Sequence, residues 1–210
     1  MTLRFWAPVL VAILGLAPIP ACATPNPKNA HRWVAPNAPV PPVQRVLVAN
    51  VMDNYVVRQE FEDEMKRQLA RYGVEGVQSY IVLPPRNEMM QRELKQRLDE
   101  SSFDSVLVIR PKTNSKDSQA SGRHGIYLPP SSYHSFWPYW KMAYGDTDPA
   151  TPYIKPNGNL RIEFNLYNTK TEKLVWSGET SVSSKDLDGL SKNYAKTIVN
   201  FLKKDKIVRK

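Results

Sequence analysis

The sequence has a single cysteine, Cys22, among its 210 residues. One thiol excludes a disulfide within the chain and leaves no thiolate cluster for a structural zinc. Histidine is almost as scarce, with only His31, His124 and His134, and scattered imidazoles lie on protein surfaces more often than they bind metals. We therefore expect no metal and no cofactor.

Motifs that mark common active sites are also missing. The sequence has no G-x-S-x-G nucleophile elbow and no glycine-rich phosphate loop. In "GDTDP", Asp146 and Asp148 lack the other ligands and the spacing of a calcium loop. A glycosidase needs two buried carboxylates, whereas we expect Glu163 and Glu179 to be solvated. We therefore predict no enzymatic activity.

No apolar run is long enough for a stable membrane span. The run "FWAPVLVAILGLAPI" follows Arg4, is interrupted by Pro8 and Pro18, and has about fifteen residues, against the roughly 20 that a spanning helix needs. A short positive start followed by such a run is typical of a secretory signal peptide. We predict a signal peptide over residues 1–21.

The end of this run resembles the lipobox of bacterial lipoproteins, since Ala21 directly precedes Cys22. The resemblance implies that Cys22 becomes the first mature residue and carries a diacylglyceryl group and further acyl chains such as palmitate. Each buried CH₂ contributes about 0.8 kcal/mol, so two or three chains anchor a protein firmly. Ala23 is not acidic, which in such lipoproteins implies the outer membrane, with the protein facing the periplasm. The alternative is an ordinary signal peptide with an incidental cysteine.

Proline dominates the segment that follows, and we predict a lipidated tether over residues 22–45. Six prolines oppose helix formation and most sheet pairing. A fully extended segment of this kind would reach on the order of 70 Å, and His31 within it should be solvated. The prolines are Pro25, Pro27, Pro36, Pro39, Pro41 and Pro42.

The remaining residues, 46–210, have the pattern of one α/β domain. Short apolar runs alternate with segments whose apolar residues recur every three or four positions, which predicts a β-α-β-α-β order with neighbouring parallel strands. The first helix should follow Asn54, a potential cap, and end at Gly73. The predicted strands are 46–52, 77–83 and 104–110. Leu94 and Leu98 belong to the buried stripe of a second helix, for which Asn87 is a candidate cap.

The C-terminal part predicts an antiparallel hairpin and a last helix. In "NLRIEFNLYN" (159–168), apolar and polar residues alternate, which indicates one buried and one solvated face. "KLVWSGETSV" (173–182) follows a turn and should pair with it. The last helix has Leu187, Leu190, Tyr194, Ile198 and Leu202 on one stripe. We thus expect a mixed sheet of about five strands.

This order, together with Cys22 and the proline-rich segment, resembles a group of small outer-membrane lipoproteins. They are the activators of penicillin-binding proteins, the exopolysaccharide-export ring lipoprotein and the N-terminal part of the curli-secretion lipoprotein. The resemblance covers residues 46–205 and rests on the element order, "FDSVLVIRP" and "KLVWSGE". It implies a domain that acts through its surfaces, by docking on a synthase or by assembling into rings.

An aromatic insertion separates the third predicted strand from the hairpin, at about residues 112–158. Residues 127–153 hold eight aromatic side chains, which is far above the overall content of 10%. Three interpretations are open: a flap packed on the sheet, an interface with protein or membrane, or a stacking platform for carbohydrate. The candidate interface residues are Tyr133, Phe136, Trp137, Tyr139, Trp140, Lys141 and Tyr144.

The formal charge of +9 favours anionic partners, or reflects a lysine-rich solvated surface. Taken together, these features predict a lipid-anchored, non-catalytic interaction module of the cell envelope. We expect it to contact the membrane through its lipid and to bind a periplasmic or outer-membrane protein, but not nucleic acid. The alternatives are a homo-oligomeric subunit of a secretion or polysaccharide-export assembly, and a carbohydrate-binding or hydrolytic protein.

Overall fold

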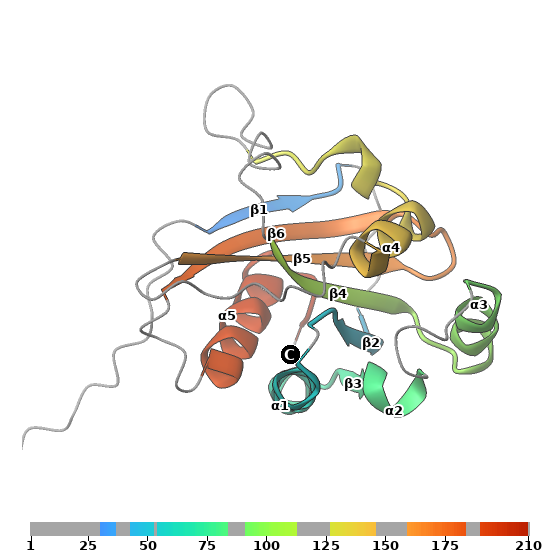
Figure 1. The fold of residues 1–210 in the computed structure, drawn as a ribbon, viewed down its shortest axis with the longest axis horizontal. Helices are drawn as coiled ribbons and strands as arrows, with labels where there is room; N and C mark the ends of the chain where they lie inside the picture. Colours follow the sequence, from blue (N-terminus) through green and yellow to red (C-terminus); the bar gives the residue numbers. More distant parts are fainter. Residues whose placement is uncertain are drawn as a thin grey trace, which may run out of the picture.

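The computed structural model describes seven stretches of the chain: 30–36, 43–52, 54–83, 91–112, 127–145, 159–183 and 190–209. The predicted signal peptide, Cys22 and Ala23, His124, Asp146, Asp148 and Tyr153 lie outside them. One six-stranded sheet runs through the described part, with helices on both faces (Figure 1). The mixed α/β fold predicted from the sequence is confirmed.

The elements follow one another in an order that alternates at first and ends in a hairpin and a helix. They are β1 (His31–Val34), β2 (Arg45–Asn50), α1 (Tyr55–Ala70), β3 (Glu75–Gln78), α2 (Ser79–Val82), α3 (Gln91–Glu100), β4 (Ser105–Lys112), the 3₁₀ turn η3 (Ser131–Tyr133), α4 (Phe136–Gly145), β5 (Asn159–Asn168), β6 (Leu174–Ser183) and α5 (Leu190–Lys204). Within the described ranges, no helix is long and apolar enough to cross a membrane.

The strands are arranged in the order β1-β6-β5-β4-β2-β3. The strand β2 pairs in parallel with both β3 and β4, as the alternating pattern predicted. The strands β5 and β6 form the predicted antiparallel hairpin, and β5 also pairs with β4 in antiparallel fashion. The sheet is therefore parallel on one side and antiparallel on the other.

The sixth strand, β1, lies inside the range that we predicted as a tether. It pairs with β6 in antiparallel register, with His31 opposite Glu179. The imidazole of His31 is half-buried and stacks on the ring of Tyr127, with centroids 6.0 Å apart, so the prediction of a solvated His31 was wrong. Residues 31–34 contain no proline, which leaves their backbone N–H groups free to pair.

The strand predicted at residues 77–83 is shorter than expected. It ends at Gln78, and the chain continues as the one-turn helix α2. The backbone N–H of Tyr80 donates to Oε2 of Glu62 on α1, 3.1 Å away, and the hydroxyl of Ser79 donates to Oε1 at 2.7 Å. At residues 79 and 80 the chain therefore forms hydrogen bonds with the Glu62 carboxylate rather than with a neighbouring strand, and it leaves the sheet there.

The first helix, α1, has the boundaries that its sequence signals predicted. The side chain of Asn54 caps it by accepting from the N–H of Val57 at 3.1 Å. Gly73 follows the helix with φ +73°, a conformation that an L side chain rarely adopts. The stripe of Phe61, Met65 and Leu69 is buried against the sheet.

Two hydrophobic cores lie on opposite faces of the sheet. The first is formed under α1 and α5, and the second under α3, η3 and α4. Because α4 covers the second face, Asn165 and Tyr167 of β5 are 0% and 1% exposed. The prediction that the polar side of β5 is solvated was therefore wrong.

Gly178 of β6 allows a close approach within the first core. The ring of Phe164 lies directly over it, and a Cβ at position 178 would stand 1.9 Å from Cε2 of that ring. The same ring stacks on Trp176, with centroids 5.2 Å apart and planes at 19°. A glycine at this position lets the Phe164–Trp176 pair lie flat on the sheet.

Candidate functional site

The most polar cluster of the second face is built on a cross-strand pair. Arg110 of β4 lies opposite Glu163 of β5, and their side chains meet with Nε 2.5 Å from Oε1. The residues are 6% and 0% exposed. Burial alone would lower the pKa of Arg110, but the charge and hydrogen bond of Glu163, together with the neighbouring phenols of Tyr139 and Tyr133, outweigh that effect and raise it. The pair is a charge-assisted bond closed to solvent.

Two tyrosines of the aromatic insertion complete what we call the glutamate cluster, formed by Arg110, Tyr133, Tyr139 and Glu163. The hydroxyls of Tyr133 and Tyr139 donate to Glu163, at 3.1 Å to Oε2 and 2.7 Å to Oε1. The guanidinium of Arg110 donates to the Tyr133 hydroxyl at 3.0 Å. Burial, and then the charge of Glu163, raise the pKa of both phenols, which keeps them protonated as donors.

A second row of hydrogen bonds ties the insertion to the sheet. The hydroxyl of Ser177 donates to Oδ1 of Asn165 at 2.6 Å, and lies 3.0 Å from the hydroxyl of Tyr127. The hydroxyl of Tyr167 donates to the carbonyl of Tyr133 at 2.9 Å. These bonds satisfy the side-chain oxygens of Asn165, Ser177 and Tyr167, which would otherwise be buried without partners.

The two carboxylates considered for glycoside chemistry do lie side by side. Glu163 and Glu179 are Cα partners across β5 and β6. Both are buried, at 0% and 4% exposure, so the expectation that they are solvated was wrong. Glu179 pairs with Arg161 at 2.8 Å, as Glu163 does with Arg110. Each of the two carboxylates is thus bound to an arginine within the fold.

Some of the seven candidate interface residues lie in the core and others lie at the surface. Tyr133, Phe136, Tyr139 and Trp140 are buried and thus unavailable to a partner in this fold. Trp137 and Tyr144 are half-buried, and Lys141 is exposed. The interpretation of the insertion as a flap packed on the sheet fits α4 and η3. His134 is exposed and stacks on Trp33 of β1, with centroids 5.8 Å apart.

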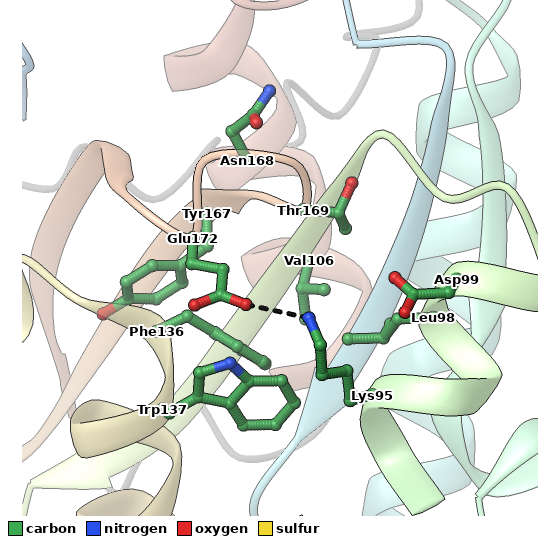
Figure 2. Close-up of a pocket in the computed structure, with 10 residues that line it drawn as sticks. All are labelled: Lys95, Leu98, Asp99, Val106, Phe136, Trp137, Tyr167, Asn168, Thr169 and Glu172. Atoms are coloured by element: carbon green, nitrogen blue, oxygen red, sulfur yellow. Dashed lines mark hydrogen bonds and ion pairs between the residues drawn. The ribbon is translucent and has the colours of Figure 1, made fainter. Parts of the chain in front are cut away.

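A shallow hollow lies between α3 and α4, over the end of the hairpin (Figure 2). Its volume of about 10 Å³ is close to that of a single water. Figure 2 shows Lys95 turned toward Glu172, 3.1 Å away, with the indole of Trp137 beside them. Hydrogen bonds from Trp137 and then Lys95 lower the pKa of Glu172. The hollow suits one water or methyl group rather than a sugar ring.

A further buried carboxylate, Glu62, was missed by the sequence analysis. It is 0% exposed and accepts from the backbone N–H of Asn50 at 2.9 Å and from Nε of Arg58 at 3.1 Å. The only sequence signal is the i, i+4 spacing of Arg58 and Glu62, which is also common on exposed helix faces. No group of three or more metal-ligating side chains occurs among the described residues.

Comparison with solved structures gives several distant likenesses. The chain is similar to a PelC dodecamer from Paraburkholderia phytofirmans at 12% identity, covering 87% of this chain and 99% of that one with a TM-score of 0.45. It is also similar to lipoprotein GNA1162 from Neisseria meningitidis, at 13% identity, 76% and 96% coverage and a TM-score of 0.39. TolB from Acinetobacter baumannii matches at 9% identity over 83% of this chain and 31% of that one, with a TM-score of 0.37.

No family model matches the sequence, and no curated protein matches it significantly. At these identities and scores, a likeness transfers neither activity nor partner to the chain. The functional argument therefore depends on the residues themselves.

Proposed function

We propose that the chain is a lipid-anchored envelope protein of the outer membrane, facing the periplasm, that acts through its surface rather than by catalysis. The observation that carries the proposal is the closed state of the glutamate cluster. The guanidinium and both phenols bond to the carboxylate of Glu163, and none of the four residues is more than 6% exposed. A cluster of this kind holds the insertion in place and leaves no opening for a substrate.

The anchor is supported by the sequence around Cys22, where an apolar run ends in Ala21. A thiol is needed because the diacylglyceryl group is transferred to sulfur. The test compares full-length chains by separating membrane and soluble periplasmic fractions. Replacing Cys22→Ala should move the protein into the soluble fraction, whereas Ala23→Ser should leave it membrane-bound.

Two outcomes would contradict the anchor. Membrane association that is unchanged in the Cys22→Ala chain would show that another segment binds the membrane. A parent chain whose mass shows an unmodified sulfur, or an uncleaved leader, would exclude lipidation at Cys22. The proposal that the chain is not an enzyme is tested separately. An enzymatic activity that is present in the parent chain and lost in a folded Glu163→Gln variant would overturn that part of the proposal.

A second candidate function is a subunit of a homo-oligomeric assembly, and the edge of the sheet favours it. The strand β3 pairs only with β2 among the described residues, so its outer backbone groups have no strand beside them. Such an edge can pair with another chain. Light scattering of the full-length chain in detergent tests this idea, and a strict monomer over a wide concentration range would contradict it.

A further inference from the structure

We propose that one end of the domain is seated on the bilayer that holds the lipid of Cys22, and that Tyr55, Val56 and Ile81 make the contact. This inference rests on the proposed lipid anchor and adds an orientation and a contact surface to it. The argument depends on where the chain joins the sheet, which apolar side chains lie at the same end of the sheet, and how far the lipid can be from it.

The chain joins the sheet at His31, and strand register shows which end of the sheet this is. One row across the strands contains His31, Glu179, Glu163 and Arg110 as successive Cα partners. On the next strand, Asn50 pairs with Ile109, so the same row continues at residue 51, just after β2 ends. We call this end of the sheet, where β1 begins and β2, β3 and β4 finish, the tether end.

The first turn of α1 and the whole of α2 lie at the tether end. The helix α1 begins at Tyr55, shortly after β2 ends, and α2 directly follows the last residue of β3. The rings of Tyr55 and Tyr80 meet edge to face, with centroids 6.4 Å apart. Figure 1 shows α1 and α2 on either side of the label for β3. These two elements therefore form one continuous surface.

Exposed apolar side chains are concentrated at the tether end. Among the described residues, the exposed large ones are Val34 at 40%, Leu128 at 51%, Tyr55 at 57%, Val56 at 60% and Ile81 at 63%. All but Val34 lie at this end, since Leu128 follows Tyr127, whose ring stacks on His31. Single exposed apolar residues are ordinary, but a group confined to one end of a domain marks a contact surface.

The length of the tether brings this surface within reach of the bilayer. Because β1 begins at His31, eight residues separate Cys22 from the sheet, and the distance from Cys22 to His31 is at most about 30 Å. Six strands spaced about 4.8 Å apart make the sheet about 24 Å wide. The lipid therefore lies within about 30 Å of His31, and the end of the sheet extends about 24 Å from there to the edge beside Tyr55, Val56 and Ile81.

The chemistry of the surface suits the boundary between headgroups and acyl chains. A tyrosine can keep its hydroxyl among the headgroups while its ring is buried, and Val and Ile side chains are apolar throughout. The basic end of α5, with Lys203 and Lys204, lies at the opposite end of the sheet, because Ile207 accepts a hydrogen bond from Val43 just before β2. The contact should therefore resist high salt, unlike one driven by charge.

The test uses the full-length lipidated chain in vesicles of phosphatidylethanolamine and phosphatidylglycerol. Because Cys22 is the only native cysteine and its sulfur would carry the lipid, Ile81→Cys introduces a single reactive thiol for a fluorophore. Lys204→Cys gives a matched exposed site at the opposite end. We expect nitroxide lipids to quench the label at position 81 several-fold more than the label at 204, with iodide in the water doing the reverse, at low and high salt alike.

The outcomes separate this inference from the lipid anchor itself. A chain that floats with the vesicles but shows equal quenching at 81 and 204 overturns the orientation and leaves the anchor standing. A chain that does not float overturns the anchor. As a second measurement, a label at Leu128→Cys should lose lipid quenching when Tyr55, Val56 and Ile81 are all changed to Ser, and retain it in the control Val34→Ser. Retained quenching in the triple variant also overturns the proposal.

Discussion

Two arginine–glutamate pairs in this chain have the same chemistry in opposite surroundings. Arg110 and Glu163 are buried beneath α4, whereas Glu75, the partner of Arg45 at 3.3 Å, has a side chain that is 61% exposed. In water the two ions of a pair are nearly as stable apart as together. In the interior, the loss of one partner leaves the other charged and unsolvated.

The substitution Glu163→Gln should therefore lower the free energy of unfolding by about 3–5 kcal/mol, because Arg110 keeps its charge in the core. The matched substitution Glu75→Gln removes the same carboxylate at the surface and should cost less than about 1 kcal/mol. Urea unfolding followed by circular dichroism measures both. Equal losses in the two variants would show that the buried pair is not the stabilising contact that the geometry indicates.

Gly178 gives a second prediction about a single residue. A methyl group at this position overlaps the ring of Phe164, so Gly178→Ala should cost about 1–3 kcal/mol through forced displacement of that ring. If the clash is the cause, the cost of Gly178→Ala should shrink when it is measured in a Phe164→Leu background. Thermal unfolding of the four chains in this double-mutant cycle measures the coupling, and purely additive costs would contradict the explanation.

At the scale of elements, sequence signals at helix ends predicted the features that depend on residues close together in the chain. The helix α1 has both ends marked, by Asn54 and Gly73, and both ends lie where those residues place them. The helix α4 lies in the aromatic insertion, where we predicted no helix. Its sequence "FWPYWKMAYG" has a proline, which is tolerated because Pro138 lies in the first turn, where its missing N–H is not needed. Its aromatic residues bury themselves against strands far away in the sequence.

The strand β1 should be weakly held, because it lies at an edge of the sheet and only four of its residues pair with β6. The stack of Trp33 on His134 contributes about 0.5–1.5 kcal/mol to its docking. Replacing Trp33→Ala should therefore speed amide exchange at residues 31–34 by about 2- to 12-fold. The control Val34→Ala, at an exposed position, should change it little. Unchanged exchange in the Trp33→Ala chain, or an equal rise in β5, would contradict local docking through this stack.

At the scale of the whole molecule, four buried tyrosines link stability to alkaline pH. Burial is the main cause that raises the pKa of Tyr127, Tyr133, Tyr139 and Tyr167 above 10. Above pH 10 the unfolded chain therefore releases protons that the folded chain retains, so folding loses stability as the pH rises. Below pH 10 both states keep these protons, and this contribution is fully present.

We expect the free energy of unfolding to fall steeply above about pH 10, with the tyrosinate absorbance of these four residues appearing together with unfolding. Ultraviolet absorbance and near-ultraviolet circular dichroism in one pH titration measure the two events. Complete tyrosinate formation near pH 10 in a chain that still shows its native circular dichroism would contradict the burial of these phenols.

The whole molecule also shows why the site resisted prediction. Alternation along β5 correctly placed Phe164 and Glu163 on opposite faces of the sheet. The alternation could not show that both faces are covered. The second face is covered by the aromatic insertion, whose Tyr133 and Tyr139 donate hydrogen bonds to Glu163 of β5. A pattern within one strand records which side chains share a face, whereas burial depends on what another segment places over that face.

The pairing of β1 with β6 sets an order of assembly. A polypeptide is synthesised from its amino end, so His31 is available early, while its partner Glu179 is among the last residues of the domain to be made. Contacts between such distant positions form late, because a long loop must close first. The first strand therefore has to wait, unpaired, until the carboxyl-terminal hairpin has formed. A chaperone that shields residues 31–34 during this interval would protect the chain from pairing with its neighbours.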